Sequence, residues 1–344
     1  MRREVDHGAV SPKVAERRFP DPIEQRTRWA AAEAILLPGL VQDLVLAQRR
    51  AITATLRMFD RLREEGEFLD ELDARLADDE FFRYAGSTVD RSDEREIERV
   101  FIDVPGESTR GDEPKRRRIK DLTVRLSWIA HDERDASLRI RFSFGHDATR
   151  DWLEPDLRAA WSDRLGAVTF EEHAALRAAL ARHDVPGALL AAPHRLSELI
   201  VYNNAPGGGA VFHHDADPGQ RGVVYAQLDG RTVWLALPRR ALAELAAAHS
   251  AFPADEVFAR MLAHDDRAIW ELLNVTPALT GAIAAQGALF VLEPGDVLLL
   301  PSHDEERCCW HSVFGVGRAP SLAHSLAIFD ALPDTLRDPR LESA

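Results

Sequence analysis

Three residues in the second half of the 344-residue chain, His213, Asp215 and His311, have side chains whose types and spacing could bind one metal ion. His213 and Asp215 are two residues apart, and side chains two apart on a β-strand point to the same side of it. His311 comes much later, directly after Trp310. If the two segments lie on neighbouring strands, two imidazoles and one carboxylate converge on one ion. Such a set leaves coordination positions open, which suits non-haem Fe(II) that binds oxygen and a co-substrate together.

The segments around these residues have the pattern of β-strands. Residues 222–228 and 232–237 alternate or run apolar, and the intervening Asp229-Gly230 predicts a hairpin. Pro294-Gly295-Asp296 predicts a second turn between two apolar strands, and residues 321–329 predict a strand after His311. An isolated His-x-Asp triplet is common in proteins without a metal. The order of the triplet, the turns and the later Trp-His pair makes coincidence a poor explanation.

At these motifs the chain resembles the jumonji-C (JmjC) and cupin-like iron(II)/2-oxoglutarate-dependent oxygenases. The resemblance covers roughly residues 195–330. The matching motifs are His213-His214-Asp215, Gln227 to Trp234 with Leu237-Pro238, Leu292 to Pro301, and Trp310-His311-Ser312-Val313. It implies a mainly β fold with α additions, whose core is a double-stranded β-helix (jelly roll) with the metal in its mouth. It also implies that His213, Asp215 and His311 are the metal ligands and the catalytic centre.

One expected co-substrate residue differs from the family pattern. Many members have a Lys that binds the distal carboxylate of 2-oxoglutarate, and Thr232 stands at that position here. A hydroxyl is a weak substitute for a cation, because charge-assisted hydrogen bonds are the stronger ones. Arg318 is the first candidate for the replacement, with Arg221 and Arg231 behind it. Neutral hydrogen bonds to the same ligand are expected from Tyr202, Asn204, Ser321 and Ser325, in addition to Thr232.

The rest of the chain is expected to surround this barrel. The predicted divisions are a flexible arm at 1–28, a helical and β-strand region at 29–190, the barrel at 191–335 with a helical insertion at 239–287, and a tail at 336–344. Within the second region, residues 40–62 have the apolar spacing of an amphipathic helix. Residues 100–104, 122–129 and 138–144 predict one antiparallel patch of strands. The apolar face of the 40–62 helix can pack within the subunit or form a homodimer.

Composition excludes some classes of partner. The formal net charge of −14 disfavours nucleic acid and anionic membrane, which attract clustered Lys and Arg. The two cysteines, Cys308 and Cys309, are too few for a disulfide framework. No apolar signal segment or membrane span is visible. We therefore expect a cytoplasmic protein whose partner is a small molecule or a peptide.

The function that the resemblance implies is an iron(II)- and 2-oxoglutarate-dependent oxygenase, a hydroxylase that also consumes dioxygen. Its substrate is expected to be a small metabolite, an amino-acid derivative or a peptide. Two alternatives remain open at this stage. One is a cupin metalloenzyme, a dioxygenase or isomerase, that does not use 2-oxoglutarate, as the missing Lys suggests. The other is a non-catalytic barrel that binds a ligand or a partner.

Overall fold

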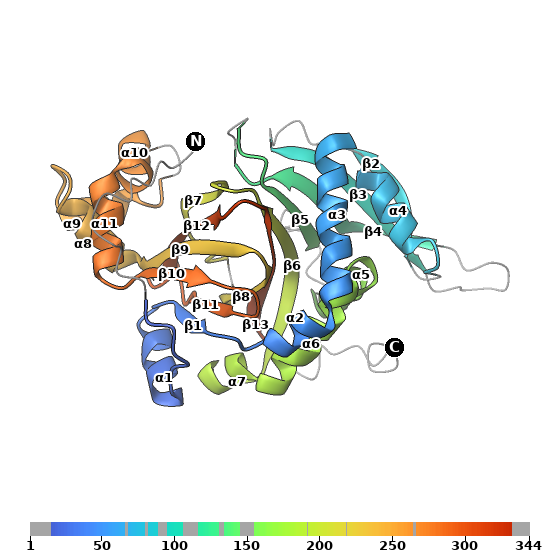
Figure 1. Ribbon diagram of the computed structural model, residues 1–344, viewed down its shortest axis with the longest axis horizontal. Coiled ribbons are helices and arrows are strands. Elements are labelled where there is room, and N and C mark those ends of the chain that lie inside the picture. Colours follow the sequence, from blue (N-terminus) through green and yellow to red (C-terminus); the bar gives the residue numbers. More distant parts are fainter. Residues whose placement is uncertain are drawn as a thin grey trace.

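Two antiparallel β-sheets face each other at the centre of the protein (Figure 1). The computed structural model describes residues 15–65, 68–79, 82–88, 95–105, 116–130, 134–144, 155–190, 192–217, 219–263 and 266–331. Among these residues the larger sheet has nine strands, ordered β1-β11-β8-β13-β6-β5-β4-β3-β2. They are β1 Ile35–Leu37, β2 Arg83–Thr88, β3 Glu96–Pro105, β4 Arg116–Trp128, β5 Leu138–Phe144, β6 His194–Asn204, β8 Gln220–Asp229, β11 Val297–Pro301 and β13 Ser321–Asp330. The smaller sheet, ordered β10-β9-β12-β7, consists of β7 Gly209–His213, β9 Arg231–Pro238, β10 Leu289–Leu292 and β12 Cys309–Val316.

The alternation of side chains along each strand divides the apolar residues between the inside and the outside of this pair of sheets. On β9, Trp234 and Ala236 belong to the core between the sheets, together with residues of β8, β10, β11 and β12. Leu235 and Leu237, which point the other way, belong to a second core that the helical insertion covers. Both faces of β9 are therefore buried, so the strand is nearly continuous in apolar residues.

Helices cover the outer faces of both sheets (Figure 1). Between β9 and β10 lie the helices of the expected insertion, which pack on the smaller sheet: α8 Arg239–Ala247, α9 Ala254–Arg260, α10 Arg267–Val275 and α11 Pro277–Ala285. The larger sheet is covered by α2 Gln42–Ala47, α3 Arg49–Glu65, α4 Phe68–Leu76, α5 Pro155–Thr169, α6 Glu171–His183 and α7 Val185–Leu190. Strands β3, β4 and β5 pair in antiparallel order, as their alternation predicts, and β5 joins them to β6.

The predicted hairpin at Asp229-Gly230 is wrong. Strand β8 pairs with β11 and β13 in the larger sheet, whereas β9 pairs with β10 and β12 in the smaller one. The turn therefore carries the chain from one sheet to the other. Gly230 has a φ of 63°, and a Cβ there would lie 2.8 Å from the Cα of Ser321. The turn residues were identified correctly, but the pairing of each strand is decided by the core and not by the turn.

The segment before β1 has defined contacts, which differs from the expectation of a flexible arm for residues 15–28. The amide of Ala15 donates to the carbonyl of Leu289 at 2.8 Å, and helix α1 (Pro22–Ala30) begins after the N-cap Asp21. Strand β1 then pairs with the edge of β11. This segment protects an edge of the larger sheet that would otherwise expose unpaired backbone groups. Residues 1–14 and the predicted tail at 336–344 lie outside the described residues.

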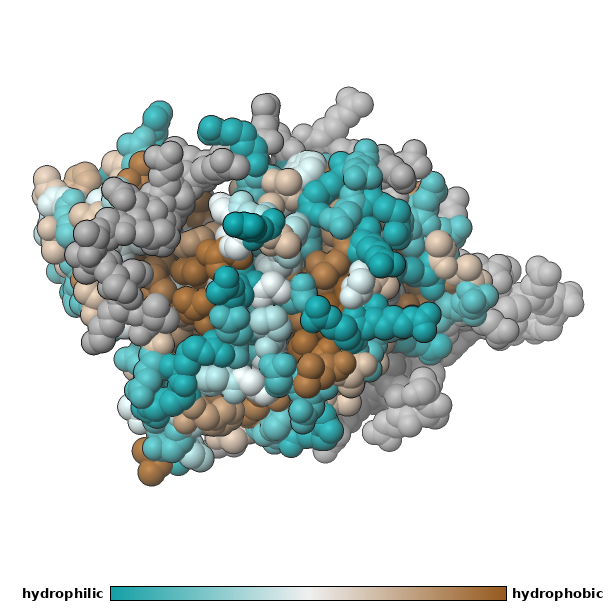
Figure 2. Space-filling model, viewed as in Figure 1, coloured by the Kyte–Doolittle hydropathy of each residue, from teal (hydrophilic) through white to brown (hydrophobic). Residues whose placement is uncertain are grey.

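The face shown in Figure 2 is largely covered by hydrophilic side chains, with smaller groups of hydrophobic ones between them. Among the helices that the structure describes, none alone has the length and apolar composition to cross a membrane. The pair α10 and α11 passes that test only when joined, and the two helices are bent by 59°.

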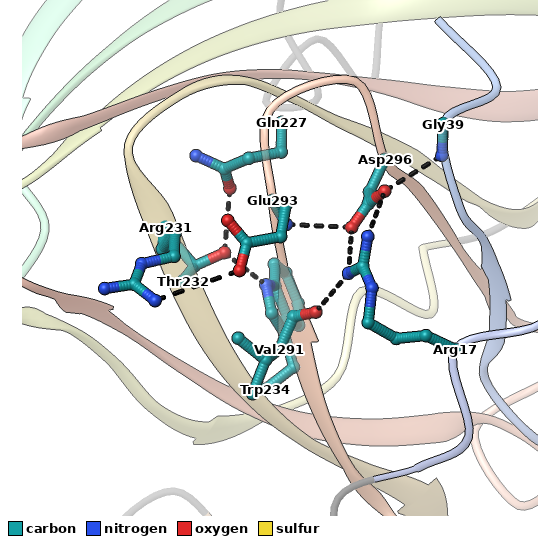
Figure 3. Close-up of polar contacts among 9 residues, drawn as sticks. All are labelled: Arg17, Gly39, Gln227, Arg231, Thr232, Trp234, Val291, Glu293 and Asp296. Carbon is teal, nitrogen blue, oxygen red and sulfur yellow. Dashed lines mark hydrogen bonds and ion pairs between the residues drawn. The ribbon is translucent and has the colours of Figure 1, made fainter. Parts of the chain in front are cut away.

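The Pro294-Gly295-Asp296 turn is held by one buried carboxylate (Figure 3). Asp296 is 1% exposed and accepts hydrogen bonds from the amides of Glu293 at 2.8 Å and Gly39 at 2.9 Å. The guanidinium of Arg17 binds both of its oxygens, at 2.6 and 3.1 Å. The carboxylate therefore joins the N-terminal segment, the chain before α2 and the β10–β11 turn.

We expect Asp296→Ala to lower the free energy of unfolding by about 2–4 kcal/mol. The loss follows because two part-buried amides and the guanidinium of Arg17 lose their buried acceptor. Arg231→Ala is the matched control, since Arg231 and Glu293 in the same region form an exposed ion pair at 3.8 Å. Such a pair contributes no more than about 1 kcal/mol. Urea unfolding followed by tryptophan fluorescence measures both variants, and equal losses would contradict this role of Asp296.

Candidate metal centre

Antiparallel pairing of β7 with β12 brings the three predicted ligands together. His213 is the last residue of β7, and its Cα is the direct partner of the Cα of His311 on β12. Asp215 lies just beyond the end of β7, not on a strand as the spacing predicted. Its carboxylate nevertheless reaches both rings, with Oδ1 3.7 Å from Nε2 of His213 and Oδ2 3.4 Å from Nε2 of His311. One ligand atom from each residue lies within 4.8 Å of the other two.

Backbone carbonyls orient the two imidazoles. Nδ1 of His213 lies 2.8 Å from the carbonyl oxygen of Val211, and Nδ1 of His311 lies 3.3 Å from that of Cys309. A carbonyl only accepts, so each Nδ1 carries the proton and each Nε2 keeps its lone pair. Both Nε2 atoms face Asp215. Hydrogen bonds of this kind fix the tautomer and the ring direction of histidines that bind metals.

The electrostatics place Asp215 and His311 in the protonation states that a metal needs. Burial alone would raise the pKa of Asp215, but the imidazoles of His311 and His213 bring it below its usual value. Burial, followed by the nearby His213, lowers the pKa of His311 to about 4. At neutral pH, His311 is therefore a neutral base and Asp215 an anion, the forms that bind divalent ions. This donor set fits an iron(II), manganese(II) or zinc(II) ion with open positions.

His214, between the two ligands in sequence, is outside the cluster. Its ring packs against Trp310 with centroids 5.2 Å apart, and its Nδ1 accepts from the amide of Ala216 at 3.1 Å. The ring therefore faces away from Asp215, as the alternation along the strand predicts.

A cavity of about 530 Å³ opens beside the cluster. Four residues predicted for the site line it: Tyr202, His213, Asp215 and Ser325. The other lining residues are Arg95, Ile129, Ala130, Arg139, Arg141, Glu198, Ile200, Gly209, Ala210, Val211, Asp217, Gln220, Val223, Trp270 and Ala327. This volume is in the range of small-molecule sites. His311 is 2% exposed and is not among the lining residues.

Thr232 is not placed to bind a ligand in this cavity. It is fully buried, its hydroxyl donates to Oε1 of Gln227 at 2.8 Å, and it accepts from Nε1 of Trp234 at 3.0 Å (Figure 3). A hydroxyl has one proton to donate, and this one is used within the barrel. Thr232 is therefore part of a structural network, although the family pattern places a co-substrate residue here.

Only some of the other residues predicted to bind the co-substrate line the cavity. Tyr202 and Ser325 line the cavity, and burial followed by the charge of Asp215 raises the pKa of Tyr202, so its hydroxyl stays protonated. Asn204 is buried and does not line the cavity. Arg318 is exposed on the β12–β13 loop and is not a lining residue.

Arginines outside the predicted set line the cavity instead. Arg139 and Arg141 come from β5, where their Cα atoms pair with those of Tyr202 and Ile200 on β6. The alternation of residues 138–144 places both on one face, but nothing in the sequence indicated that β5 joins β6. Of the earlier alternatives, Arg221 binds Asp330 at 2.7 Å and Arg231 lies near Glu293, and neither lines the cavity.

Comparison with known proteins found similarity to solved structures only. No protein-family model matches the chain, and no curated protein matches its sequence. A crystal structure of the non-heme alpha ketoglutarate dependent epimerase SnoN from nogalamycin biosynthesis is 15% identical, with a TM-score of 0.30 and coverage of 93% of each chain. SnoN in complex with Fe3+, alpha ketoglutarate and nogalamycin RO is 16% identical, with a TM-score of 0.35 and coverage of 93% of this chain and 94% of that one.

A third structure is described as an oxidoreductase of the 2OG-Fe(II) oxygenase family from Burkholderia pseudomallei. It is 12% identical, with a TM-score of 0.29 and coverage of 92% of this chain and 94% of that one. All three TM-scores lie below 0.5. A functional conclusion for this chain therefore has to rest on its own residues.

We expect His213→Ala to weaken Mn(II) binding at least roughly a hundredfold, because the ion loses one of three protein ligands; even changes outside the ligand set cost about 10–100-fold. His214→Ala is the matched control, and its affinity should stay within about twofold, since its ring faces away. Calorimetric titration of the metal-free protein measures both. A His213→Ala variant that keeps its affinity would contradict the assignment of the cluster.

Proposed function

We propose that the protein is an iron(II)- and 2-oxoglutarate-dependent oxygenase that hydroxylates a small metabolite, an amino-acid derivative or a peptide. The observation that carries the proposal is the convergence of His213, Asp215 and His311 beside a cavity of small-molecule size. Three protein ligands on one side of an ion leave room for a chelating co-substrate and for dioxygen. A binding module that merely holds a ligand has no need for such a set.

The arrangement of strands supports a jelly-roll barrel for this site. From β6 to β13, four strands belong to the larger sheet in the order β11-β8-β13-β6, and four form the smaller sheet β10-β9-β12-β7. We assign this pair of four-stranded sheets to the double-stranded β-helix. Two of the proposed ligands, His213 and His311, then lie on neighbouring strands of the smaller sheet, and Asp215 follows directly after the first of them.

In this proposal each group has a limited task. Bound iron would supply the coordination sites and the redox chemistry that side chains lack. His213, Asp215 and His311 hold it, and burial of His311 keeps water from one side of the site. Tyr202 and Ser325 line the same cavity and donate hydrogen bonds to a carboxylate of the co-substrate. The protonated hydroxyl of Tyr202 suits this role because a carboxylate accepts and does not donate.

One observation favours a second candidate, a cupin metalloenzyme that does not use 2-oxoglutarate. Thr232 replaces the family's Lys and its hydroxyl is already bonded to Gln227. Among the described lining residues, the arginines come from β5 and from the turn before β3, outside the eight barrel strands. Such an enzyme would bind its substrate directly to the metal.

A stepwise titration distinguishes the two functions. The protein is loaded with Fe(II) without oxygen, 2-oxoglutarate is added, and the visible spectrum is recorded before air is admitted. The proposal expects a new absorption band from the 2-oxo acid on iron, followed by one equivalent or more of succinate. Iron binding without a band or succinate would favour the second candidate. Absence of iron binding would contradict both.

Two variants test where the carboxylate of the co-substrate binds. We expect Tyr202→Phe to weaken 2-oxoglutarate binding about fivefold, the effect of one lost hydrogen bond of about 1 kcal/mol. Arg318→Ala is the control and should change the affinity less than twofold, because Arg318 is exposed and outside the cavity. A larger effect for Arg318→Ala than for Tyr202→Phe would place the carboxylate at the β12–β13 loop instead.

A further inference from the structure

Strand β7 has one residue more than the part of β12 with which it pairs. Ala210 pairs with Val313, and His213 pairs with His311. Between these two pairs β7 has two residues and β12 has one, which is a β-bulge. A shift of one residue in a strand moves every following side chain to the other face of the sheet. This bulge directly precedes the candidate ligand His213.

The extra residue decides which of two adjacent histidines faces the metal cluster. Ala210 packs against the core between the sheets. Regular alternation from there would turn Phe212 and His214 to the same side and His213 away from it. The structure has the opposite arrangement, with Phe212 in the core under the helical insertion and His214 against Trp310 of that core. The bulge therefore exchanges His214 for His213 at the candidate site.

Two side chains bind the backbone of the bulge. A bulge disrupts the ladder locally, so the backbone groups of the longer strand need other partners. The amide of Phe212 donates to Oδ1 of Asn274 on α10 at 2.8 Å. The hydroxyl of Ser312, the residue of β12 opposite the bulge, donates to the carbonyl of Ala210 at 3.0 Å. The bulge is thus held from both sides of β7.

The bulge also sets the direction of the His213 ring. Val211 is the first of its two residues, and the carbonyl of Val211 accepts from Nδ1 of His213 at 2.8 Å. Because Nδ1 carries the proton, Nε2 keeps its lone pair and lies 3.7 Å from Oδ1 of Asp215. A change in the backbone at the bulge would therefore move the ligand atom as well as the ring.

Asn274 is the contact that comes from outside the two strands. Helix α10 lies beside β7 (Figure 1), and Asn274 is 6% exposed among the buried residues Ile269, Leu272 and Leu273 of that helix. A buried amide group costs free energy unless its polar atoms are hydrogen-bonded. Oδ1 accepts from the bulge, and Nδ2 donates to the carbonyl of Trp270 at 3.0 Å. The helix therefore presents a fixed acceptor to β7.

We propose that Asn274 and Ser312 are positioning residues that hold the bulge in β7, and that the bulge makes His213, and not His214, a ligand of the metal. The proposal rests on the proposed function only for the presence of a divalent ion at this cluster. It requires neither 2-oxoglutarate nor oxygen, so it is testable separately from the oxygenase reaction.

Amide hydrogen exchange in the metal-free, full-length protein tests whether Asn274 holds the bulge. In Asn274→Ala the amide of Phe212 loses its acceptor, and we expect its exchange to become at least about fivefold faster, the effect of one hydrogen bond. Asn274→Asp keeps an acceptor oxygen and loses only the donor to Trp270, so the protection should be retained. Equal exchange rates in the unmodified protein and Asn274→Ala would overturn the proposal.

Calorimetric titration with Mn(II) tests whether the bulge positions the ligand. We expect Asn274→Ala to weaken binding roughly tenfold, as the loss of partners outside the ligand set does at metal sites, and Asn274→Asp to stay within about threefold. Ser312→Ala should weaken binding in the same direction as Asn274→Ala.

Asn203→Ala is the matched control for stability. Asn203 is buried and donates to the carbonyl of Ser321 at 3.0 Å, between β6 and β13 of the larger sheet. Its loss should lower the melting temperature, as that of any buried hydrogen bond does, and leave the Mn(II) affinity within about twofold. A loss of affinity equal to that in Asn274→Ala would assign Asn274 a purely structural role and overturn the proposal.

Double variants identify which histidine the metal uses. With Asn274 in place, His213→Ala should weaken Mn(II) binding far more than His214→Ala. In the Asn274→Ala background the bulge loses one of its contacts, so we expect the effect of His213→Ala to fall and that of His214→Ala to rise, each by roughly threefold or more. Such coupling is specific to the choice of ligand, because a general loss of stability would leave the ratio of the two effects unchanged.

Three further outcomes would overturn the proposal. They are an unchanged Mn(II) affinity in Asn274→Ala, equal losses in Asn274→Ala and Asn274→Asp, and effects of the two histidine variants that do not depend on residue 274. Absence of Mn(II) binding by the unmodified protein would overturn it together with the metal centre. A protein that binds Mn(II) with these dependences but forms no succinate in the iron titration would refute the oxygenase proposal alone.

Discussion

The pairing of β7 with β12 is the interaction on which the rest of the site depends. It sets His213 opposite His311, and the chain beyond β7 then brings Asp215 against both rings. The pairing requires close approach at the start of β7, where Gly209 has a φ of 149° and a Cβ would lie 2.2 Å from the carbonyl oxygen of Val313. A side chain at this position would separate the strands and with them the two imidazoles.

The surrounding elements hold this edge of the smaller sheet in place. Strand β7 pairs only with β12 among the described strands, so its other side needs a partner. Asn274 of α10 provides one by accepting from the amide of Phe212 at 2.8 Å. The same helix places Trp270 in the cavity wall. The helical insertion thus supports the strand that carries the candidate ligand His213 and shapes the space beside it.

Local sequence patterns predicted the centre of the site but not its surroundings. The spacing of His213 and Asp215 and the Trp310-His311 pair identified side chains that the structure does bring together. Strand partners depend on long-range packing, so the Asp229-Gly230 turn suggested a hairpin where the chain changes sheets. For the same reason Arg141 was overlooked, because its place beside the cavity follows from the pairing of β5 with β6. The bulge in β7 has no local sequence signal either, because only the pairing with β12 defines it.

The central claim is that one ion joins His213, Asp215 and His311. Anomalous X-ray diffraction at the iron edge, from crystals grown with Fe(II) in the absence of oxygen, tests it most directly. The account predicts a single strong peak roughly 2.0–2.3 Å from Nε2 of both histidines and from a carboxylate oxygen of Asp215, a typical range for divalent ions. A peak bound by other side chains, or no peak at this cluster in crystals that contain iron, would contradict it.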